Sequence, residues 1–149
     1  MESVCQIRVA EFGQLTVQEL HAIARLRQQV FYLEQHVDCE DWDAIDPQSV
    51  CVWAVAAGET VGFLRIVPPG LIYAEASIGR VAVAAACRRR GIARCMLQEA
   101  LRYIGEQWGP AVRISSQEYI VPLYEQLGFE VVSERYLEAG IPHRKMLRK

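Results

Sequence analysis

One stretch decides the fold: Val81-Ala-Val-Ala-Ala-Ala-Cys87-Arg-Arg-Arg-Gly91-Ile-Ala93-Arg94. Its first residues end a β-rich run, and the residues after the glycine open a long amphipathic helix. The start of a helix carries free backbone amides and a partial positive charge, so a loop at this place attracts phosphate. The small residues Gly91 and Ala93 let a pyrophosphate approach the backbone, and the arginines at 88–90 supply donors that suit phosphate oxygens. The loop has neither the G-K-S/T of a Walker loop nor the G-x-G-x-x-G of a Rossmann loop.

Outward from this stretch, apolar residues at strand and helix spacing predict a series of further elements. Strands are expected over residues 4–9, 50–57, 60–67, 73–83, 111–115, 129–132 and 144–147. Helices are expected after the capping box Thr16–Glu19, over residues 92–108, and as a short helix that ends near Gly128. Gly58-Glu59 is typical of a hairpin turn, and residues 36–49 form a polar, acidic loop. Strands mixed with helices indicate an α+β or mixed α/β fold, with helices on the faces of a sheet.

The bulk composition excludes several classes of protein. With 149 residues, of which 52% are hydrophobic and 23% charged, we expect one globular domain over residues 1–149. A net charge of −2 gives no reason to expect a nucleic-acid or anionic-membrane partner. The five cysteines show no C-x-x-C spacing and the three histidines are scattered, so we expect reduced thiols and no metal site. No signal peptide or apolar run long enough to span a bilayer is evident, which favours a cytoplasmic protein.

Two motifs carry a resemblance to a known family. Residues 88–93 resemble the Q/R-x-x-G-x-G/A signature of the GNAT superfamily of N-acetyltransferases. A second segment, Gln117-x-x-Ile120-x-x-Leu123-Tyr124-Glu-Gln-Leu-Gly128-Phe129, is similar to the superfamily's N-x-x-A-x-x-L/F-Y-x-x-x-G-F, with Gln117 in the place of the usual Asn. Three weaker segments resemble the ElaA-like and YjcF-like branch: Arg27-x-x-Val30-Phe31-x-x-Glu34-Gln35, Asp41-x-Asp43-x-x-Asp46, and Glu138-Ala-Gly140-Ile141-Pro142-His143-x-x-Met146.

The resemblance implies the GNAT acyl-CoA N-acyltransferase fold, in which a mostly antiparallel sheet splays at its centre to admit the pantetheine arm of acetyl-CoA. The cofactor-binding residues that it implies are Val81, Ala82, Val83, Arg88, Arg89, Arg90, Gly91, Ile92, Ala93, Arg94 and Gln117. A backbone amide near Val83 would polarise the thioester carbonyl.

Tyr124 is the expected catalytic residue. In the resemblance it points at the cofactor sulfur and protonates the departing thiolate. The chemistry is reasonable, because a phenol with a pKa of about 10 is protonated at pH 7 and can give its proton to a leaving thiolate. The alternative is a tyrosine that only packs in the core on an apolar helix face.

The general base is not fixed by the sequence. In relatives a Glu often stands just before the Arg-Val of the strand, but Gly79 occupies that place here. Glu75 would share strand parity with Gly79, about 13 Å away along an extended strand. Glu34 and His143 are the other candidates, and a relay through water is equally plausible.

Two further features of the sequence each allow two interpretations. Arg27 falls on an apolar helix stripe, and it either shapes the acceptor pocket or pairs with Glu34 or a loop carboxylate. The acidic loop at 36–49 either attracts a cationic acceptor or, as we favour, is simply solvated.

The leading functional hypothesis is an N-acetyltransferase that moves the acetyl group of acetyl-CoA directly to a primary amine of a small molecule or peptide. The second is a regulatory module that binds acyl-CoA without turnover, which the absence of a Glu at Gly79 supports. A nucleic-acid binder built on the arginines at 88–90 is disfavoured by the acidic charge balance. The acceptor, the preferred acyl chain and the oligomeric state, a homodimer included, are left open by the sequence.

Overall fold

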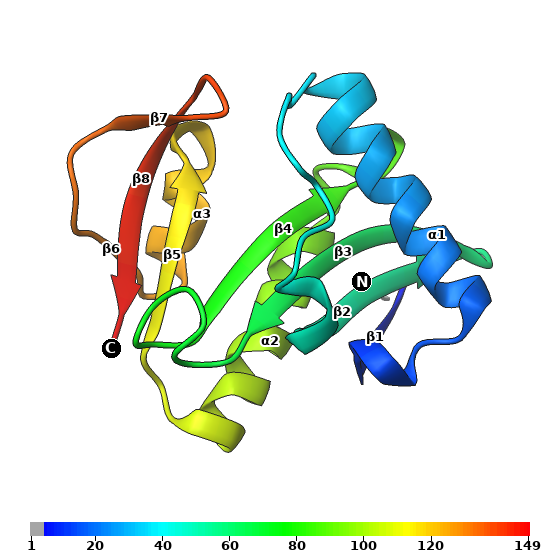
Figure 1. Ribbon diagram of the computed structural model, residues 1–149, viewed down its shortest axis with the longest axis horizontal. Helices are drawn as coiled ribbons and strands as arrows, with labels where there is room; N and C mark the ends of the chain where they lie inside the picture. Colours follow the sequence, from blue (N-terminus) through cyan, green and yellow to red (C-terminus); the bar gives the residue numbers. More distant parts are fainter. Residues whose placement is uncertain (1–4) are drawn as a thin grey trace.

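The computed structural model describes residues 5–149. It contains two antiparallel sheets that lie edge to edge (Figure 1). The first sheet has the order β1-β2-β3-β4 and the second the order β5-β8-β6, with β7 also paired to β8. The strands of the first sheet are β1 (Gln6–Glu11), β2 (Val50–Ala56), β3 (Glu59–Val67) and β4 (Ser77–Val83). Those of the second are β5 (Val112–Gln117), β6 (Glu130–Val131), β7 (Tyr136–Glu138) and β8 (Ile141–Arg148). Val4, which we expected to begin the first strand, lies outside the described residues.

Helices cover both faces of the first sheet (Figure 1). Helix α1 (Val17–Arg27) begins at the predicted capping box, where Thr16 and Glu19 each accept the other's backbone amide, and it continues as the π-helical segment η2 (Gln28–Glu34). Helix α2 (Ile92–Trp108) lies on the opposite face, and α3 (Val121–Gln126) lies behind the second sheet. Short 3-10 turns complete the chain at η1 (Phe12–Gln14), η3 (Asp46–Gln48), η4 (Ala85–Cys87) and η5 (Glu118–Ile120).

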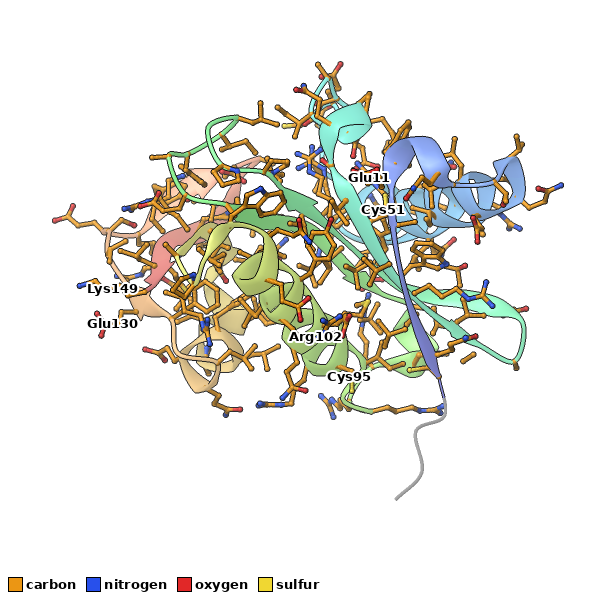
Figure 2. The ribbon with its side chains drawn as sticks, turned by 90° about the horizontal axis from the view of Figure 1, so that it is seen from below. Glu11, Cys51, Cys95, Arg102, Glu130 and Lys149 are labelled. Carbon is orange, nitrogen blue, oxygen red and sulfur yellow. The ribbon has the colours of Figure 1, made fainter. Side chains whose placement is uncertain are left out.

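The alternation of side chains along β2 and β3 explains this layering. Val52 and Leu64 join the core under α2, whereas Trp53 and Phe63 join a second cluster under α1. Because successive residues of a strand point to opposite faces, a strand buried on both faces is apolar throughout. The outer side of α2 is polar instead, and Arg102 forms ion pairs there with Glu99 and Glu106 (Figure 2).

The two sheets meet at one point and then diverge. Ala76 and Val112 form an isolated parallel bridge, and the amide of Arg113 donates to the carbonyl of Ala76 at 3.0 Å. Beyond this bridge β4 pairs with β3 and β5 pairs with β8, and no strand among residues 5–149 pairs with β4 on its other side. The predicted splayed, mostly antiparallel sheet is therefore confirmed.

A β-bulge bends β4 within the splayed region. Phe63 pairs with Ala82 and Arg65 with Gly79, so two residues of β4, Arg80 and Val81, lie opposite one residue of β3. Arg80 has a φ of 53°, which is rare for a residue other than glycine. The backbone is therefore strained at the bulge, and contacts with the surrounding residues must stabilise it.

Most predicted elements are present, with three corrections. The strand expected over 73–83 begins only at Ser77, so Glu75 lies in a bend and does not share strand parity with Gly79. The last strand is longer than expected, because it begins at Ile141 and includes Pro142. The short strand β7 was not predicted; it pairs with the start of β8 through residues 136–138.

The close approach of β3 to α2 gives a test of this packing. A Cβ atom at Gly62 would lie 3.0 Å from both the Cε and Sδ atoms of Met96, which is tighter than ordinary contact. We predict that Gly62→Val lowers the free energy of unfolding by about 1–3 kcal/mol through overpacking. Met96→Ala alone should lower it by about 2–5 kcal/mol.

Combined, the two changes should partly compensate, because the valine fills the space that the shortened side chain vacates. Urea denaturation of the wild type, both single variants and the double variant measures this coupling. Strict additivity of the two losses would contradict the packing described here.

Candidate active site

A cleft of about 290 Å³ opens where β4 and β5 separate. Both sheets and the end of the first helical segment contribute to its walls. Among the residues that line it are Gly79 and Val81 from β4, Gln117 from β5, Tyr124 from α3 and His143 from β8. Residues that lie far apart in the sequence therefore meet in one cavity, which is the arrangement expected of a ligand site.

The loop before α2 leads sharply into the helix. Arg89 and Gly91 have φ values of 65° and 78°, so the chain turns sharply before the helix begins. No side chain caps α2, whose first intrahelical bond runs from the amide of Cys95 to the carbonyl of Gly91 at 3.0 Å. The amides of the first turn therefore remain available as donors to an anion.

The side chains of this loop are held in different ways. Arg88 donates from Nε to the carbonyl of Val83 at 3.0 Å and pairs with both carboxylate oxygens of Glu34. Arg94 hydrogen-bonds the side chain of Gln126 on α3. Residues 89 and 90 are exposed arginines, whereas Ile92 is buried in the core and anchors the helix start.

Tyr124 lines the cleft and is only 4% exposed. Its ring packs edge-on against Phe129 with ring centroids 5.5 Å apart. Burial, with a smaller contribution from Tyr119, raises the pKa of the Tyr124 phenol above its ordinary value. The phenol therefore stays protonated at neutral pH and can act as a proton donor but not as a base.

His143 also lines the cleft, with 6% of the residue exposed. Its Nδ1 lies 2.7 Å from the carbonyl oxygen of Ile141, and its Nε2 lies 3.5 Å from a carboxylate oxygen of Glu138. A carbonyl oxygen only accepts, so Nδ1 must carry the hydrogen, and Nε2 of the neutral ring is left able to take up a proton. The ring stacks on Tyr136, which fixes its orientation.

The structure separates the other candidates for a base from the cleft. Glu34 does not line it, because its carboxylate is paired with Arg88, which lowers the pKa of Glu34. Glu75 is paired with Arg113 at 3.1 Å, and this hydrogen bond lowers the pKa of Glu75. Neither carboxylate lies among the lining residues, so His143 is the candidate that the cleft retains.

Gln117 links the second sheet to the end of the first helical segment. Its side-chain Nε2 donates to the Oε1 atom of Gln35 at 3.2 Å, which joins β5 to the turn after η2. Both glutamines line the cleft. Of the three predicted residues on β4, Val81 lines the cleft, Ala82 is buried under α1, and the Val83 carbonyl holds Arg88.

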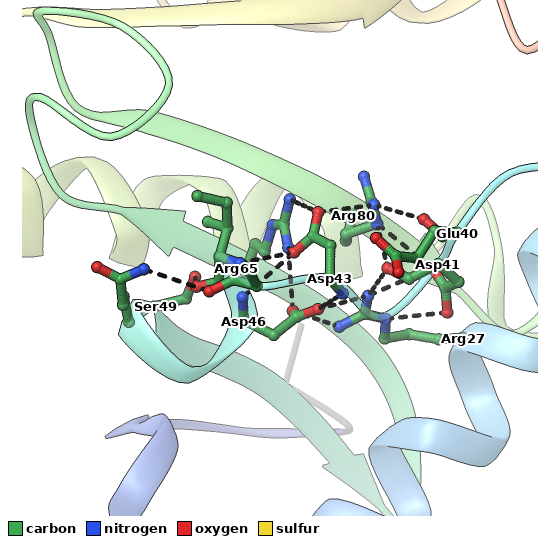
Figure 3. A network of polar contacts seen from close by, with 11 residues as sticks. Arg27, Glu40, Asp41, Asp43, Asp46, Ser49, Arg65 and Arg80 are labelled. Carbon is green, nitrogen blue, oxygen red and sulfur yellow. Dashed lines mark hydrogen bonds and ion pairs between the residues drawn. The ribbon is translucent and has the colours of Figure 1, made fainter.

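Three arginines and three aspartates form a polar network beside the cleft (Figure 3). Its arginines are Arg27, Arg65 and Arg80, and its aspartates are Asp41, Asp43 and Asp46. Arg27 donates from Nη1 to Asp46 at 2.8 Å, and Arg65 pairs with both oxygens of Asp43 at 2.7 and 3.1 Å. Arg80 donates to the carbonyls of Asp41 and Glu40. The charges of the six side chains sum to zero, so the buried guanidinium groups are compensated.

This network decides two alternatives that the sequence left open. Arg27 is fully buried and pairs with loop carboxylates, and its guanidinium lies 3.7 Å from the centroid of the Trp42 ring. Arg27 does not pair with Glu34, whose partner is Arg88, and it is not among the residues that line the cleft. Our expectation that the acidic loop is solvated holds for Asp38 and Glu40, which are exposed. It was wrong for Asp41, Asp43 and Asp46, which are bound by arginines of the chain itself.

Arg65 and Arg80 line the cleft and were not predicted as site residues. Arg65 lies within residues 61–67, a run that is otherwise apolar, and this was the signal available in the sequence. A charge in a strand buried on both faces needs a partner, and the acidic loop supplies it.

Comparison with known proteins identifies the class. Residues 13–149 match the acetyltransferase (GNAT) domain family, so the chain belongs to the GNAT acetyltransferases. Within that family it belongs to the ElaA-like branch: ElaA of Escherichia coli is 30% identical over 142 residues, which cover 92% of each chain. A UPF0039 protein of Schizosaccharomyces pombe is 36% identical over 138 residues, or 91% of each chain.

Solved structures confirm the predicted fold. An acyl-CoA N-acyltransferase from Pseudomonas aeruginosa is 30% identical, with a TM-score of 0.91 over 97% of this chain and 99% of that chain. The crystal structure of Escherichia coli ElaA gives a TM-score of 0.90 at 27% identity, with the same coverage. An aminoglycoside 6'-N-acetyltransferase complexed with coenzyme A shares the fold, with a TM-score of 0.71 at 16% identity over 95% of this chain and 96% of that chain.

Two absences hold for the described part of the chain. Within residues 5–149, no helix is long and apolar enough to cross a membrane. In the same range, no group of three or more His, Cys, Asp or Glu side chains is arranged to hold a metal ion.

The pairing of Asp43 predicts a pH dependence of stability. Burial alone raises the pKa of Asp43, but the hydrogen bonds and charge of Arg65, aided by Arg80, outweigh burial and lower the pKa from 3.8 to about 2. A carboxyl whose pKa is lower in the folded state stabilises the fold above its unfolded pKa, and the contribution is lost as pH falls from about 4 to 2.

We therefore predict that Asp43→Asn lowers the free energy of unfolding at pH 7 by about 1–3 kcal/mol. The difference from the wild type should shrink as the pH falls from 5 towards 2, because the wild-type carboxyl becomes protonated there. Urea unfolding at several pH values measures it, with Asp38→Asn at an exposed position as the control. A difference that stays constant with pH would contradict the assigned pKa.

Proposed function

We propose that the protein is an N-acetyltransferase that moves the acetyl group of acetyl-CoA directly to a primary amine of a small molecule or peptide. The observation that supports it most is the meeting of Tyr124, His143 and the β4 strand around one cleft, where two strands separate. Membership of the GNAT acetyltransferases supports the same chemistry.

The cofactor would lie along the free side of β4. The amides at the start of α2, with the arginines of residues 88–90, would hold its pyrophosphate. The pantetheine arm would enter the cleft beside Val81, where backbone groups of β4 have no neighbouring strand to pair with. The thioester would then lie near Tyr124.

The acceptor reacts after losing a proton. An ammonium ion cannot attack a carbonyl, so Nε2 of His143, or a water next to it, would first take up one proton. The neutral nitrogen then forms the new C–N bond, and the C–S bond breaks as the tetrahedral intermediate collapses. Tyr124 would give its proton to the leaving sulfur, and the proton lost by the new amide nitrogen would restore the phenol through water. The products are the acetylated amine and free coenzyme A.

Tyr124→Phe separates catalysis from binding. We predict that it lowers kcat by about a hundredfold to ten-thousandfold, the usual contribution of a general acid, with little change in affinity for acetyl-CoA. Release of coenzyme A with a panel of amines gives kcat, and isothermal titration with acetyl-CoA gives the affinity. Tyr119→Phe is the matched control, because this tyrosine lines the same cleft but is 73% exposed.

A kcat that is unchanged in Tyr124→Phe would contradict the assigned role. Binding of acetyl-CoA without turnover in the wild type and in every variant would support the alternative function instead, a regulatory module that binds acyl-CoA. Gly79 is the observation in favour of that alternative, because this cleft residue offers no carboxylate as a base.

A further inference from the structure

A tight hairpin places a carboxylate beside the imidazole of His143. The two residues of the turn between β7 and β8 have φ values of 52° and 75°. Positive φ at both residues of a two-residue hairpin loop is typical of a type I′ turn, and the turn fixes the register of the strands. Glu138 therefore pairs with Ile141, two residues before His143, and these three side chains point to the same face. Glu138 and His143 are diagonal neighbours on that face, and both line the cleft.

Each ring nitrogen of His143 lies near a hydrogen-bond acceptor. The Nδ1–H group donates to the carbonyl oxygen of Ile141 at 2.7 Å, so Nε2 of the neutral ring has a lone pair and no hydrogen. Nε2 lies 3.5 Å from a carboxylate oxygen of Glu138, which can also only accept. Two acceptors at this distance repel each other, and a positively charged donor that binds both removes the repulsion. The two side chains therefore suit a cation that carries N–H groups.

The pair is open to the cleft. Within residues 5–149, Nε of Arg65 is the one buried side-chain nitrogen or oxygen that lacks a hydrogen-bond partner. Nε2 of His143 has no hydrogen-bond partner among the described residues either, so it is not a buried atom, and a ligand in the cleft can reach it. The side chain of Glu138 is 55% exposed.

Glu138 supplies an uncompensated negative charge to the cleft. Among the described residues that line the cleft, it is the one carboxylate. The two arginines of the lining, Arg65 and Arg80, are already paired with aspartates of the polar network. No arginine or lysine within residues 5–149 forms an ion pair with Glu138, whose ionic contact is with the ring of His143. Its charge is therefore available to attract a cationic ligand.

A chain of hydrogen bonds orients this carboxylate. The hydroxyl of Ser115 donates to Oε1 of Glu138 at 3.3 Å, and the ammonium group of Lys145 donates to the hydroxyl of Tyr136 at 3.0 Å. The hydroxyls of Tyr136 and Ser115 are hydrogen-bonded to each other. Because Ser115 gives its hydrogen to Glu138, Tyr136 must donate to Ser115. The donors thus run in one direction from Lys145 to Oε1, which leaves Oε2 beside His143.

We propose that Glu138 and His143 together bind the ammonium group of the acceptor, an inference that rests on the proposed acetyltransferase function. The carboxylate of Glu138 accepts one N–H of the ammonium group, and Nε2 of His143 accepts a second and takes up that proton. The amine is then neutral and its lone pair can form the C–N bond. The positive charge has moved from the ammonium to the imidazolium and stays beside the same carboxylate, so the proton transfer separates no charge. After the products leave, the imidazolium passes its proton to water at the exposed carboxylate.

Glu138→Gln tests the proposal in turnover, because it removes the charge and keeps the size of the side chain. We expect kcat/KM for the amine to fall about tenfold to a hundredfold, since one charge-assisted hydrogen bond is lost. The loss should appear in KM for the amine and not in kcat or in KM for acetyl-CoA, because the carboxylate stabilises the charge equally before and after the proton moves. Release of coenzyme A with 2-phenylethylamine, spermidine and L-leucinamide measures it. Glu130→Gln on β6 is the matched control, because Glu130 is exposed and does not line the cleft.

NMR of the His143 ring tests the same site without turnover. The chain has three histidines, and the other two, His21 and His36, are exposed. In the variant His21→Gln/His36→Asn, the ring signals come from His143 alone, and asparagine tolerates the φ of 55° at residue 36. Methylammonium chloride should shift these signals more than sodium chloride does at the same concentration. We expect Glu138→Gln in this background to abolish the difference.

The two measurements fail in different ways. If an amine is acetylated and Glu138→Gln has the same KM for it as Glu130→Gln, the ammonium site is refuted and the acetyltransferase function stands. If no amine is acetylated, the proposed function fails, and the NMR measurement then decides the ammonium site by itself. Equal shifts with the two salts would overturn it, and a shift specific to methylammonium that requires Glu138 would support it.

Discussion

The central constraint on this structure is that the sheet is not continuous. The bridge between Ala76, just before β4, and Val112 of β5 is where the two sheets are joined, and beyond it no strand among residues 5–149 pairs with the outer edge of β4. Backbone amides and carbonyls on such an edge require water or a ligand as partners, and a free edge inside a cleft is a natural place for an extended molecule. The cavity, the cluster of Tyr124 and His143, and the proposed path of the cofactor all follow from this separation.

The arginine–aspartate network holds the bulged strand in place. Arg80 sits at the bulge with a positive φ, and its side chain donates to the acidic loop, which also binds Arg27 from α1 and Arg65 from β3. Buried ion pairs of this kind add little net stability, but they fix one arrangement of the elements, because each alternative leaves a charge unpaired. Helix α1, the loop and the bulged strand are therefore tied together at one wall of the cleft. The unmatched Nε of Arg65 is the exception within an otherwise complete network.

Local patterns predicted the elements and the motifs but not the long-range pairings. The capping box at Thr16, the helix over 92–108 and the loop that opens it follow from local spacing and residue type, and the structure has them. The pairing of Arg27 with Asp46, or of Glu34 with Arg88, depends on residues that come together only in the fold. For that reason the sequence could not choose among Glu34, Glu75, His143 and a water relay, whereas the structure leaves only His143 of these three side chains in the cleft.

Hydrogen exchange with and without acetyl-CoA tests most directly whether the free edge of β4 is the cofactor site. At saturating acetyl-CoA, the account predicts slower amide exchange in residues 77–83 of β4 and in the first turn of α2, because ligand oxygens would accept hydrogen bonds there. Residues 6–11 of β1, at the opposite edge of the same sheet, should exchange at an unchanged rate. No protection of β4, or protection of both edges alike, would contradict the claim that the break in the sheet is where the cofactor binds.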